Sequence, residues 1–215
     1  MIPLLHDLTD ETVLVFGGGP VGARKARRFA AEADVVVVSP EFADREFGAA
    51  ELVREAPDTD GIRAWVERTD PALVVAATDD ADLNATAEAA AREVGALVNR
   101  ADDHGEQDMG NVVVPATVRD DPVVMAVATG GHSPALSKYL RESFEAQFAD
   151  AGSMAELTSD LREELQSTDM SPTERRDAVR TVVRSERVWK ALDSGRPKSK
   201  RVAADVIGHQ MGDTS

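Results

Sequence analysis

The stretch TVLVFGGGPVGARKARRF, residues 12–29, decides the fold. Its first residues are apolar or β-branched and predict a strand, three glycines follow, and the chain then takes on helical periodicity. Gly17, Gly19 and Gly22 fit the pattern G-x-G-x-x-G between a strand and a helix. The first glycine of such a turn permits the sharp bend, the second lets backbone approach a pyrophosphate, and the third lets helix and strand pack closely. We therefore predict that this turn holds a dinucleotide.

Short apolar runs alternate with alanine-rich or amphipathic stretches through the first half of the chain. Because the predicted strands are apolar along nearly their whole length, we expect a parallel sheet that is covered on both faces. This pattern predicts an α/β fold with a doubly wound, Rossmann-type sheet. The predicted strands are residues 12–17, 34–39, 51–55, 72–78 and 96–101, and the predicted helices are residues 20–32 and 81–94, the second capped by Asp79 or Asp80 and ended by Gly95.

The pattern changes after Ala101. Two further strands are predicted at 111–118 and 122–129, and a helix begins after Ser133, a good N-cap, with Pro134 in its first turn. From Gly152 onward the chain is helical in character. The capping boxes SMAE (153–156) and SPTE (171–174) mark the starts of helices, and Gly195 and Pro197 mark the end of one. The basic run 196–201 is interpreted as a solvated linker, with a patch for an acidic ligand as the alternative.

Three parts follow from this organisation. We predict a nucleotide-binding domain at 1–110, a small segment of two strands and a helix at 111–150, and a helical domain at 151–215.

The charge balance excludes one class of partner. The chain has 39 Asp and Glu against 24 Lys and Arg, a formal charge of −15 over 215 residues, whereas nucleic-acid binding needs a basic face. Carboxylate-rich, lysine-poor surfaces are typical of cytoplasmic proteins from salt-loving organisms, and an ordinary acidic protein is the alternative.

Cysteine is absent, which excludes disulfides, thiolate catalysis and Cys-ligated metals. No stretch approaches the roughly 20 apolar residues of a membrane span, and the start of the chain lacks the features of a signal peptide. His104 has no second histidine at ligand spacing, so no metal site is predicted. We expect a cytoplasmic protein.

Residues at the carboxyl ends of the strands are expected to line the ligand crevice. In dinucleotide-binding folds an acid at the end of the second strand reads the ribose, but here Ser39 stands in that place and Glu41 follows. A serine in that place leaves the choice between NAD and NADP less settled than an aspartate would. The expected cofactor residues are Gly17, Gly19, Pro20, Val21, Gly22, Ser39, Pro40, Thr78 and Asp79.

Gly130 and Gly131 precede a predicted helix in the stretch VATGGHSPAL, residues 127–136. The turn is either a pocket in which N–H groups and the helix dipole receive substrate carboxylates, or an ordinary capping turn. A polyanionic substrate would also need cations in a chain of this charge. The candidates are Arg100, Arg119, Lys138 and Arg141.

Several motifs together resemble the precorrin-2 dehydrogenase family of siroheme synthesis. They are IPLLHDL at 2–8, GGGPVGARKA at 17–26, VVAATDDADLNATA at 74–87, LVNRADD at 97–103 and VATGGHSPAL at 127–136. The resemblance implies a homodimer in which residues 111–150 are the dimerisation segment, and an enzyme that oxidises precorrin-2 to sirohydrochlorin with NAD as cofactor. Some members also insert ferrous iron to give siroheme, and the resemblance leaves open whether this chain does.

The resemblance also implies residue roles. The family's catalytic aspartate lies in an Asn-x-x-Asp stretch, which here is Asn99 to Asp102, so Asp102 is the expected base for the proton that dehydrogenation releases. Judged by the residues alone, a turn or cap role for Asp102 is favoured over catalysis, and the resemblance reverses that order. The expected substrate contacts are Asn99, Gly130, Gly131 and Ser133.

Two other function classes fit parts of the sequence. A regulatory module that senses NAD would share the glycine turn but has no need of LVNRADD or GGHSPA. A dehydrogenase for another small substrate would usually carry a catalytic His or Lys at a strand end, and none is evident here.

Overall fold

The computed structural model describes residues 2–101 and 112–212, and the chain divides into two compact units, Met1–Val114 and Pro115–Ser215. Each unit is described by itself. The division of the second unit into a dimerisation segment and a helical domain stays a prediction.

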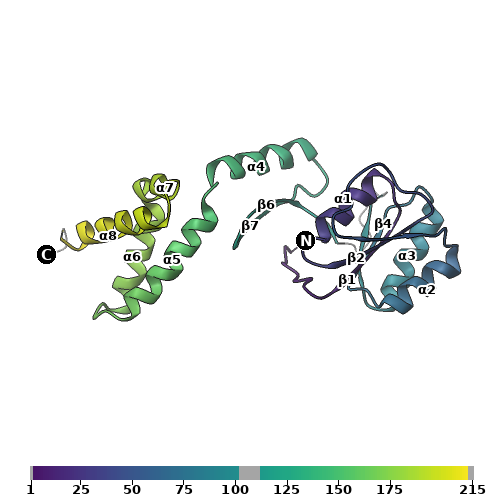
Figure 1. Cartoon of the computed structure of the whole chain (residues 1–215), viewed down its shortest axis with the longest axis horizontal. Coiled ribbons are helices and arrows are strands. Elements are labelled where there is room, and N and C mark those ends of the chain that lie inside the picture. Colours follow the sequence, from purple (N-terminus) through teal and green to yellow (C-terminus); the bar gives the residue numbers. More distant parts are fainter. Residues whose placement is uncertain (1, 102–111, 213–215) are drawn as a thin grey trace. The chain divides into compact units, whose positions relative to one another are not determined.

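The first unit contains a five-stranded parallel sheet in the order β3-β2-β1-β4-β5. This order confirms the predicted doubly wound fold, because the chain first builds outward from β1 through β2 and then reverses to β4 on its other side. The elements are β1 (Thr12–Phe16), α1 (Pro20–Phe29), β2 (Asp34–Ser39), β3 (Glu51–Arg54), α2 (Thr59–Thr69), β4 (Leu73–Ala76), α3 (Ala81–Glu93) and β5 (Leu97–Arg100). Figure 1 labels the strands β1, β2 and β4 and the helices α1, α2 and α3 that lie beside them.

Both faces of this sheet are covered, which explains why its strands are so apolar. Successive side chains of a strand point to opposite faces. Leu14 and Phe16 of β1 accordingly pack in the core beneath α2 and α3, whereas Val13 and Val15 pack in the core beneath α1. Four of the five β1 residues are buried and the fifth is half-buried, as a central strand requires.

Helix α2 was not predicted from the sequence. Asp58 caps it by accepting a hydrogen bond from the Gly61 backbone N–H at 2.8 Å. Its buried residues Ile62, Trp65 and Val66 follow the i, i+3, i+4 spacing of an amphipathic helix. The signal was present, but a glycine and two aspartates around the first turn obscured it.

The second unit begins with a two-stranded antiparallel sheet of β6 (Ala116–Asp120) and β7 (Val123–Val127). β6 starts later than the predicted strand at 111–118, since Pro115 has no N–H to donate to a strand ladder. Five helices follow: α4 (Pro134–Gln147), α5 (Ala151–Gln166), α6 (Pro172–Arg184), α7 (Glu186–Leu192) and α8 (Arg196–Gly212).

The core of the second unit lies among its last four helices. Met154 and Leu157 of α5 pack with Val182 of α6, Val188 of α7 and Ile207 of α8. By contrast, α4 has no buried residue, and the hairpin buries only Val118.

Two predicted helix boundaries in this unit need correction. Ser153 is not an N-cap, because α5 already begins at Ala151 after Asp150, and the SMAE stretch lies inside the helix. The predicted helix that runs past Trp189 breaks at Ser185, whose backbone is extended, into α6 and α7. The second capping box is confirmed: Ser171 and Glu174 exchange side-chain hydrogen bonds with each other's backbone N–H.

The basic run 196–201 is not a linker but the first turn and a half of α8. Arg196 bonds Glu156 at 3.4 Å and Asp160 at 2.6 Å, and Lys200 bonds Asp160 at 2.8 Å. These ion pairs tie α8 to α5, so the basic run is engaged within the unit.

Lys25 on α1 is half-buried and has no ion pair among the described residues. Burial, with a smaller contribution from the positive charges of Arg24 and Arg28, lowers the pKa of Lys25 from 10.5 to about 8. The folded state therefore binds this proton less tightly than the unfolded chain does. This penalty is present below pH 8 and is relieved as the pH rises from about 8 to 10.5.

We expect Lys25→Met to raise the free energy of unfolding at pH 7 by on the order of 2 kcal/mol, because the variant keeps the packing without the buried charge. Denaturant unfolding at pH 7 and at pH 10 measures the gain, which should shrink at the higher pH. Arg24→Met is the matched control, since it removes an exposed cation from the same helix. A gain no larger than that of the control would contradict the prediction.

Candidate functional site

The turn after β1 needs glycine at two of its predicted positions. Gly17 has a φ of +113°, in the region that favours glycine, and a Cβ there would collide with the carbonyl oxygen of Ala77. A Cβ at Gly22 would collide with the carbonyl oxygen of Gly17. Because neither glycine has a side chain, the backbone can bend sharply here and α1 can lie close to β1, as the motif predicts.

Gly18 is a third required glycine, which the sequence analysis missed. A Cβ at this position would collide with the carbonyl oxygen of Glu41 and would lie 2.8 Å from the Phe42 ring. The Ala43 N–H also donates to the Gly18 carbonyl oxygen at 2.8 Å. The segment that follows β2 is therefore held directly against the glycine turn.

Gly19 differs from its neighbours. A Cβ there would meet no protein atom within 4 Å, and its φ of −73° suits any residue, so nothing in the chain itself requires glycine. Gly19 also precedes α1, whose first turn has no side-chain cap and no acidic residue, and Pro20 occupies its first position. Open space beside uncapped N–H groups and a helix dipole is what a pyrophosphate needs, so the turn fits a dinucleotide.

The end of β2 lies beside this turn. Ser39 is buried and its hydroxyl donates to the Glu41 carbonyl oxygen at 2.8 Å. The Pro40 carbonyl oxygen accepts a hydrogen bond from Arg54 at 3.0 Å. Both predicted residues are thus at the expected edge, but β2 ends without a carboxylate to read a ribose, so the geometry does not separate NAD from NADP.

The end of β4 is organised by Asn84 on α3, another residue that the sequence analysis missed. The Asn84 side chain accepts from the Thr78 N–H at 3.1 Å and from the Thr78 hydroxyl at 2.7 Å, and donates to the Thr78 carbonyl oxygen at 2.9 Å. Asp80, not Asp79, caps α3. Asp79 is left exposed at the same edge as the glycine turn, since Ala77 contacts Gly17.

The Asn99 side chain and nearby backbone groups bond the end of β5 to Val112 and to β4. The Asn99 Nδ2 donates to the Val112 carbonyl oxygen at 2.7 Å, and the Val112 N–H donates to the Val98 carbonyl oxygen at 2.6 Å. The Ala101 N–H in turn donates to the Ala76 carbonyl oxygen at 2.9 Å. We call these bonds the β5 clasp. They fix both flanks of residues 102–111 at the carboxyl edge of the sheet.

Asp102, the expected base, lies outside the described residues, as do Asp103 and His104. Asn99 is 6% exposed, and its Oδ1 is buried with no hydrogen-bond partner among residues 2–101 and 112–212. A buried acceptor without a donor costs on the order of 1–3 kcal/mol, so this atom is a candidate for contact with a ligand.

Gly130, Gly131 and Ser133 lie in the second unit. Both glycines have positive φ, +60° and +80°, which explains the residue type as a turn requirement. Ser133 caps α4 by accepting from the Leu136 N–H at 3.2 Å. The Thr129 hydroxyl contacts the Ser137 hydroxyl at 2.9 Å across the turn. Capping thus accounts for this geometry, and the anion pocket stays a prediction.

The cations predicted to meet a polyanion are already engaged. Arg100 bonds the buried Glu88 at 3.1 Å. Lys138 and Arg141 pair with acids of their own helix, Arg141 with Glu145 at 2.6 Å. Arg119 also has a partner. In the parts of the chain that the structure describes, no group of three or more acidic or histidine side chains could hold a metal ion, and no helix has the length and apolar character of a membrane span.

Comparison with known proteins places this geometry in a family. Residues 4–116 match a family model described as "Putative NAD(P)-binding". The chain is 33% identical to the precorrin-2 dehydrogenase of Methanosarcina barkeri, over 98% of this chain and 95% of that protein. The chain belongs to the precorrin-2 dehydrogenase family. Siroheme synthases contain a module similar to this chain. The first unit of this chain is an NAD(P)-binding domain.

Other relatives in the precorrin-2 dehydrogenase family are longer. The siroheme synthases of Pseudomonas putida strain F1 and Methylococcus capsulatus are 33% and 34% identical over 99% and 97% of this chain, which spans only 48% and 44% of their lengths. The solved structure of SirC, a precorrin-2 dehydrogenase, superimposes with a TM-score of 0.62 over 97% of this chain at 20% identity. That likeness confirms the fold.

Proposed function

We propose that this protein oxidises precorrin-2 to sirohydrochlorin with NAD. The observation that carries the proposal is the carboxyl edge of the first sheet, where the uncapped glycine turn and the β5 clasp lie, in a chain similar to a precorrin-2 dehydrogenase over its whole length. The reaction removes two hydrogens from the macrocycle, so that precorrin-2 and NAD⁺ give sirohydrochlorin, NADH and a proton.

When bound, NAD accepts the hydride; the chain supplies orientation and the base. Gly19 and the first N–H groups of α1 bind the pyrophosphate. Thr78, fixed by Asn84, holds the end of β4 beside the glycine turn. Asp102 would take the proton, and the β5 clasp fixes Ala101 and Val112, the residues on either side of its segment.

The direct test is an anaerobic assay with precorrin-2 and NAD at low and at high ionic strength. We expect one NADH for each sirohydrochlorin, followed by the absorbance of both products, and slower turnover with NADP. Tight NAD binding without any oxidation would favour a sensing module over an enzyme. Absence of both binding and oxidation would overturn the proposal.

Insertion of ferrous iron is a separate part of the proposal and rests on the family resemblance alone. We expect the protein to accelerate siroheme formation from sirohydrochlorin and ferrous iron above the uncatalysed rate. An unchanged rate would restrict the protein to the oxidation step.

We also propose that the protein is a homodimer formed through residues 111–150. The β6–β7 hairpin buries only Val118, and α4, which packs against it, leaves Leu136 47% and Tyr139 66% exposed. A second copy would cover both. Sedimentation equilibrium at micromolar concentration should give twice the chain mass, and a monomer would contradict the proposal.

A further inference from the structure

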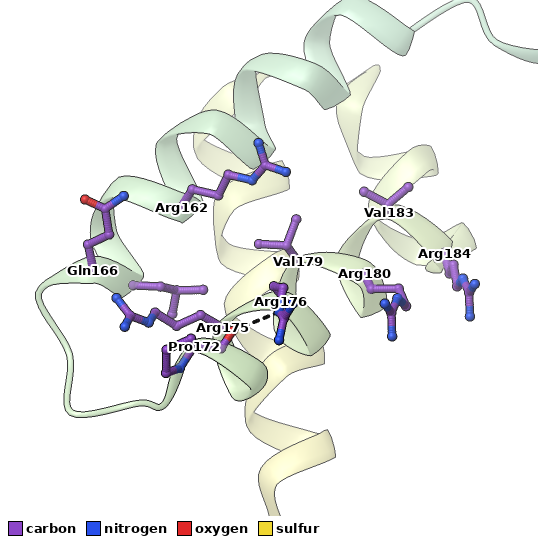
Figure 2. Close-up of a pocket in the computed structure, with 10 residues that line it drawn as sticks. Arg162, Gln166, Pro172, Arg175, Arg176, Val179, Arg180, Val183 and Arg184 are labelled. Carbon is purple, nitrogen blue, oxygen red and sulfur yellow. Dashed lines mark hydrogen bonds between the residues drawn. The ribbon is translucent and has the colours of Figure 1, made fainter.

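The second unit contains a hollow between α5 and α6 with a volume of about 710 Å³, which we call the arginine hollow (Figure 2). Half of the residues that line it are arginines: Arg162 from α5, and Arg175, Arg176, Arg180 and Arg184 from α6. None of its lining residues is acidic. In a chain with a formal charge of −15, such a concentration of positive charge calls for an explanation.

Most of these guanidinium groups have no carboxylate partner. Within the described part of the chain, Arg162, Arg175 and Arg184 form no ion pair, and Arg176 donates only to the oxygens of Pro172 and Thr173. Arg180 pairs with Asp177 at 2.9 Å, and the two side chains are 59% and 44% exposed, so this ion pair is accessible to water. The neighbouring α8 shows the contrast, because Arg196 and Lys200 are each bonded to two acids of α5.

The arrangement works against the stability of α6 itself. Arg176 and Arg180, and Arg180 and Arg184, are like charges at i, i+4, and each such pair destabilises a helix by about 0.2–0.5 kcal/mol. The second unit does not lack acids to relieve this repulsion, since residues 115–215 contain 16 Asp and Glu against 14 Lys and Arg. An anionic ligand would remove the repulsion.

The floor of the hollow is apolar. Leu165 is buried and Val179 is partly buried. Val183, which also lines the hollow, is 41% exposed. Figure 2 shows the arginine side chains arranged around Val179. A ligand that suits this surface has an apolar body to lie on the valines and several anionic groups at its edge.

The charges are too spread out for a compact phosphate group. Arg175 and Arg184 are separated by about 14 Å along α6, at 1.5 Å per residue. The N-terminus of α6 offers no anion site either, because Ser171 already accepts a bond from the Glu174 N–H, and the Glu174 carboxylate lies at that end. Separated carboxylates around a broad apolar ring match this spacing better than a phosphate chain does.

We propose that the arginine hollow binds a macrocyclic polycarboxylate through α5 and α6. The identification of this ligand as a tetrapyrrole rests on the proposed function. Arginine suits the task, because its planar fork bonds a carboxylate with two parallel hydrogen bonds and stacks on flat apolar groups.

The test uses the full chain and uroporphyrin, a fluorescent porphyrin with two carboxylates on every pyrrole, titrated without NAD. We expect Arg175→Gln/Arg176→Gln/Arg184→Gln to weaken binding at least tenfold. The matched control is Arg187→Gln/Lys198→Gln/Arg201→Gln, which also neutralises three exposed cations of the same unit, all outside the hollow, and should bind like the parent. Melting temperatures check that both variants are folded.

Two further arms identify the ligand chemistry. Coproporphyrin, with one carboxylate on each pyrrole, should bind more weakly than uroporphyrin, and tripolyphosphate should compete poorly. Equal uroporphyrin affinity in all three proteins, or efficient displacement by tripolyphosphate, would overturn the inference. This readout needs neither NAD nor turnover. Failure to oxidise precorrin-2 would therefore contradict the proposed function without contradicting binding at the arginine hollow.

Discussion

Asp102→Asn is expected to lower kcat for precorrin-2 oxidation by about 10²–10⁴-fold, the usual contribution of a positioned general base. The amide keeps the size of the side chain but cannot take the proton. NAD affinity and melting temperature should stay unchanged, since the glycine turn and the β5 clasp are built from other residues. Stopped-flow measurement of NADH formation at saturating NAD gives the rate directly.

Asp103→Asn is the matched control for that experiment, because it removes the adjacent carboxylate with the same change of charge. It should retain most of the activity. Should Asp102→Asn oxidise precorrin-2 at the parent rate, the assignment of the base would be wrong, although membership of the family would stand. Loss of activity in both variants to the same extent would point to the negative charge of the segment rather than to one base.

Gly22→Ala and Gly19→Ala are expected to fail in opposite ways. The methyl of Gly22→Ala collides with the Gly17 carbonyl oxygen, so α1 must move away from β1. Overpacking of this kind typically costs about 1–3 kcal/mol of stability, and NAD binding should be lost with the turn. The methyl of Gly19→Ala meets no protein atom, so the free energy of unfolding should be nearly unchanged.

NAD affinity should nevertheless fall at least tenfold in Gly19→Ala, because the methyl takes the space through which the pyrophosphate approaches the backbone. Denaturant unfolding with and without NAD separates the two effects in each variant. If Gly19→Ala bound NAD as tightly as the parent, the dinucleotide could not pass over Gly19. If Gly22→Ala were as stable as the parent, the close contact between α1 and β1 would have little energetic weight.

Most elements of the first unit could be predicted because their signals are local, α2 being the exception. The central strands β1, β2 and β4 are short apolar runs, and α3 has an alanine-rich body between Asp80 and Gly95. In the second unit, Ser153 shows the limit of such signals. The SMAE stretch has the residues of a capping box, yet α5 starts at Ala151, where the Gly152 N–H donates to an Asp120 carboxylate oxygen at 2.7 Å. A contact between residues 32 positions apart overrides the local pattern.

The same distinction applies to the candidate site. Gly17 and Gly22 were predictable, since their spacing is part of a known turn. Gly18 was not, because its need for glycine comes from the Glu41 carbonyl oxygen after another strand. Asn84 is a similar case: its side chain serves Thr78, six residues earlier, and nothing in an alanine-rich helix marks it as more than a tolerated polar residue.

The β5 clasp has a consequence for how such proteins diversify. Because the bonds of Val112 to Val98 and Asn99 join the chain on both sides of residues 102–111, an insertion or deletion within that decapeptide need not alter the register of β5 against β4. Evolution, or an engineer, could exchange the decapeptide as a cassette while the sheet and the glycine turn stay fixed. Chimaeras that carry the equivalent segment of a longer relative should then have the melting temperature of the parent, even if their substrate specificity changes.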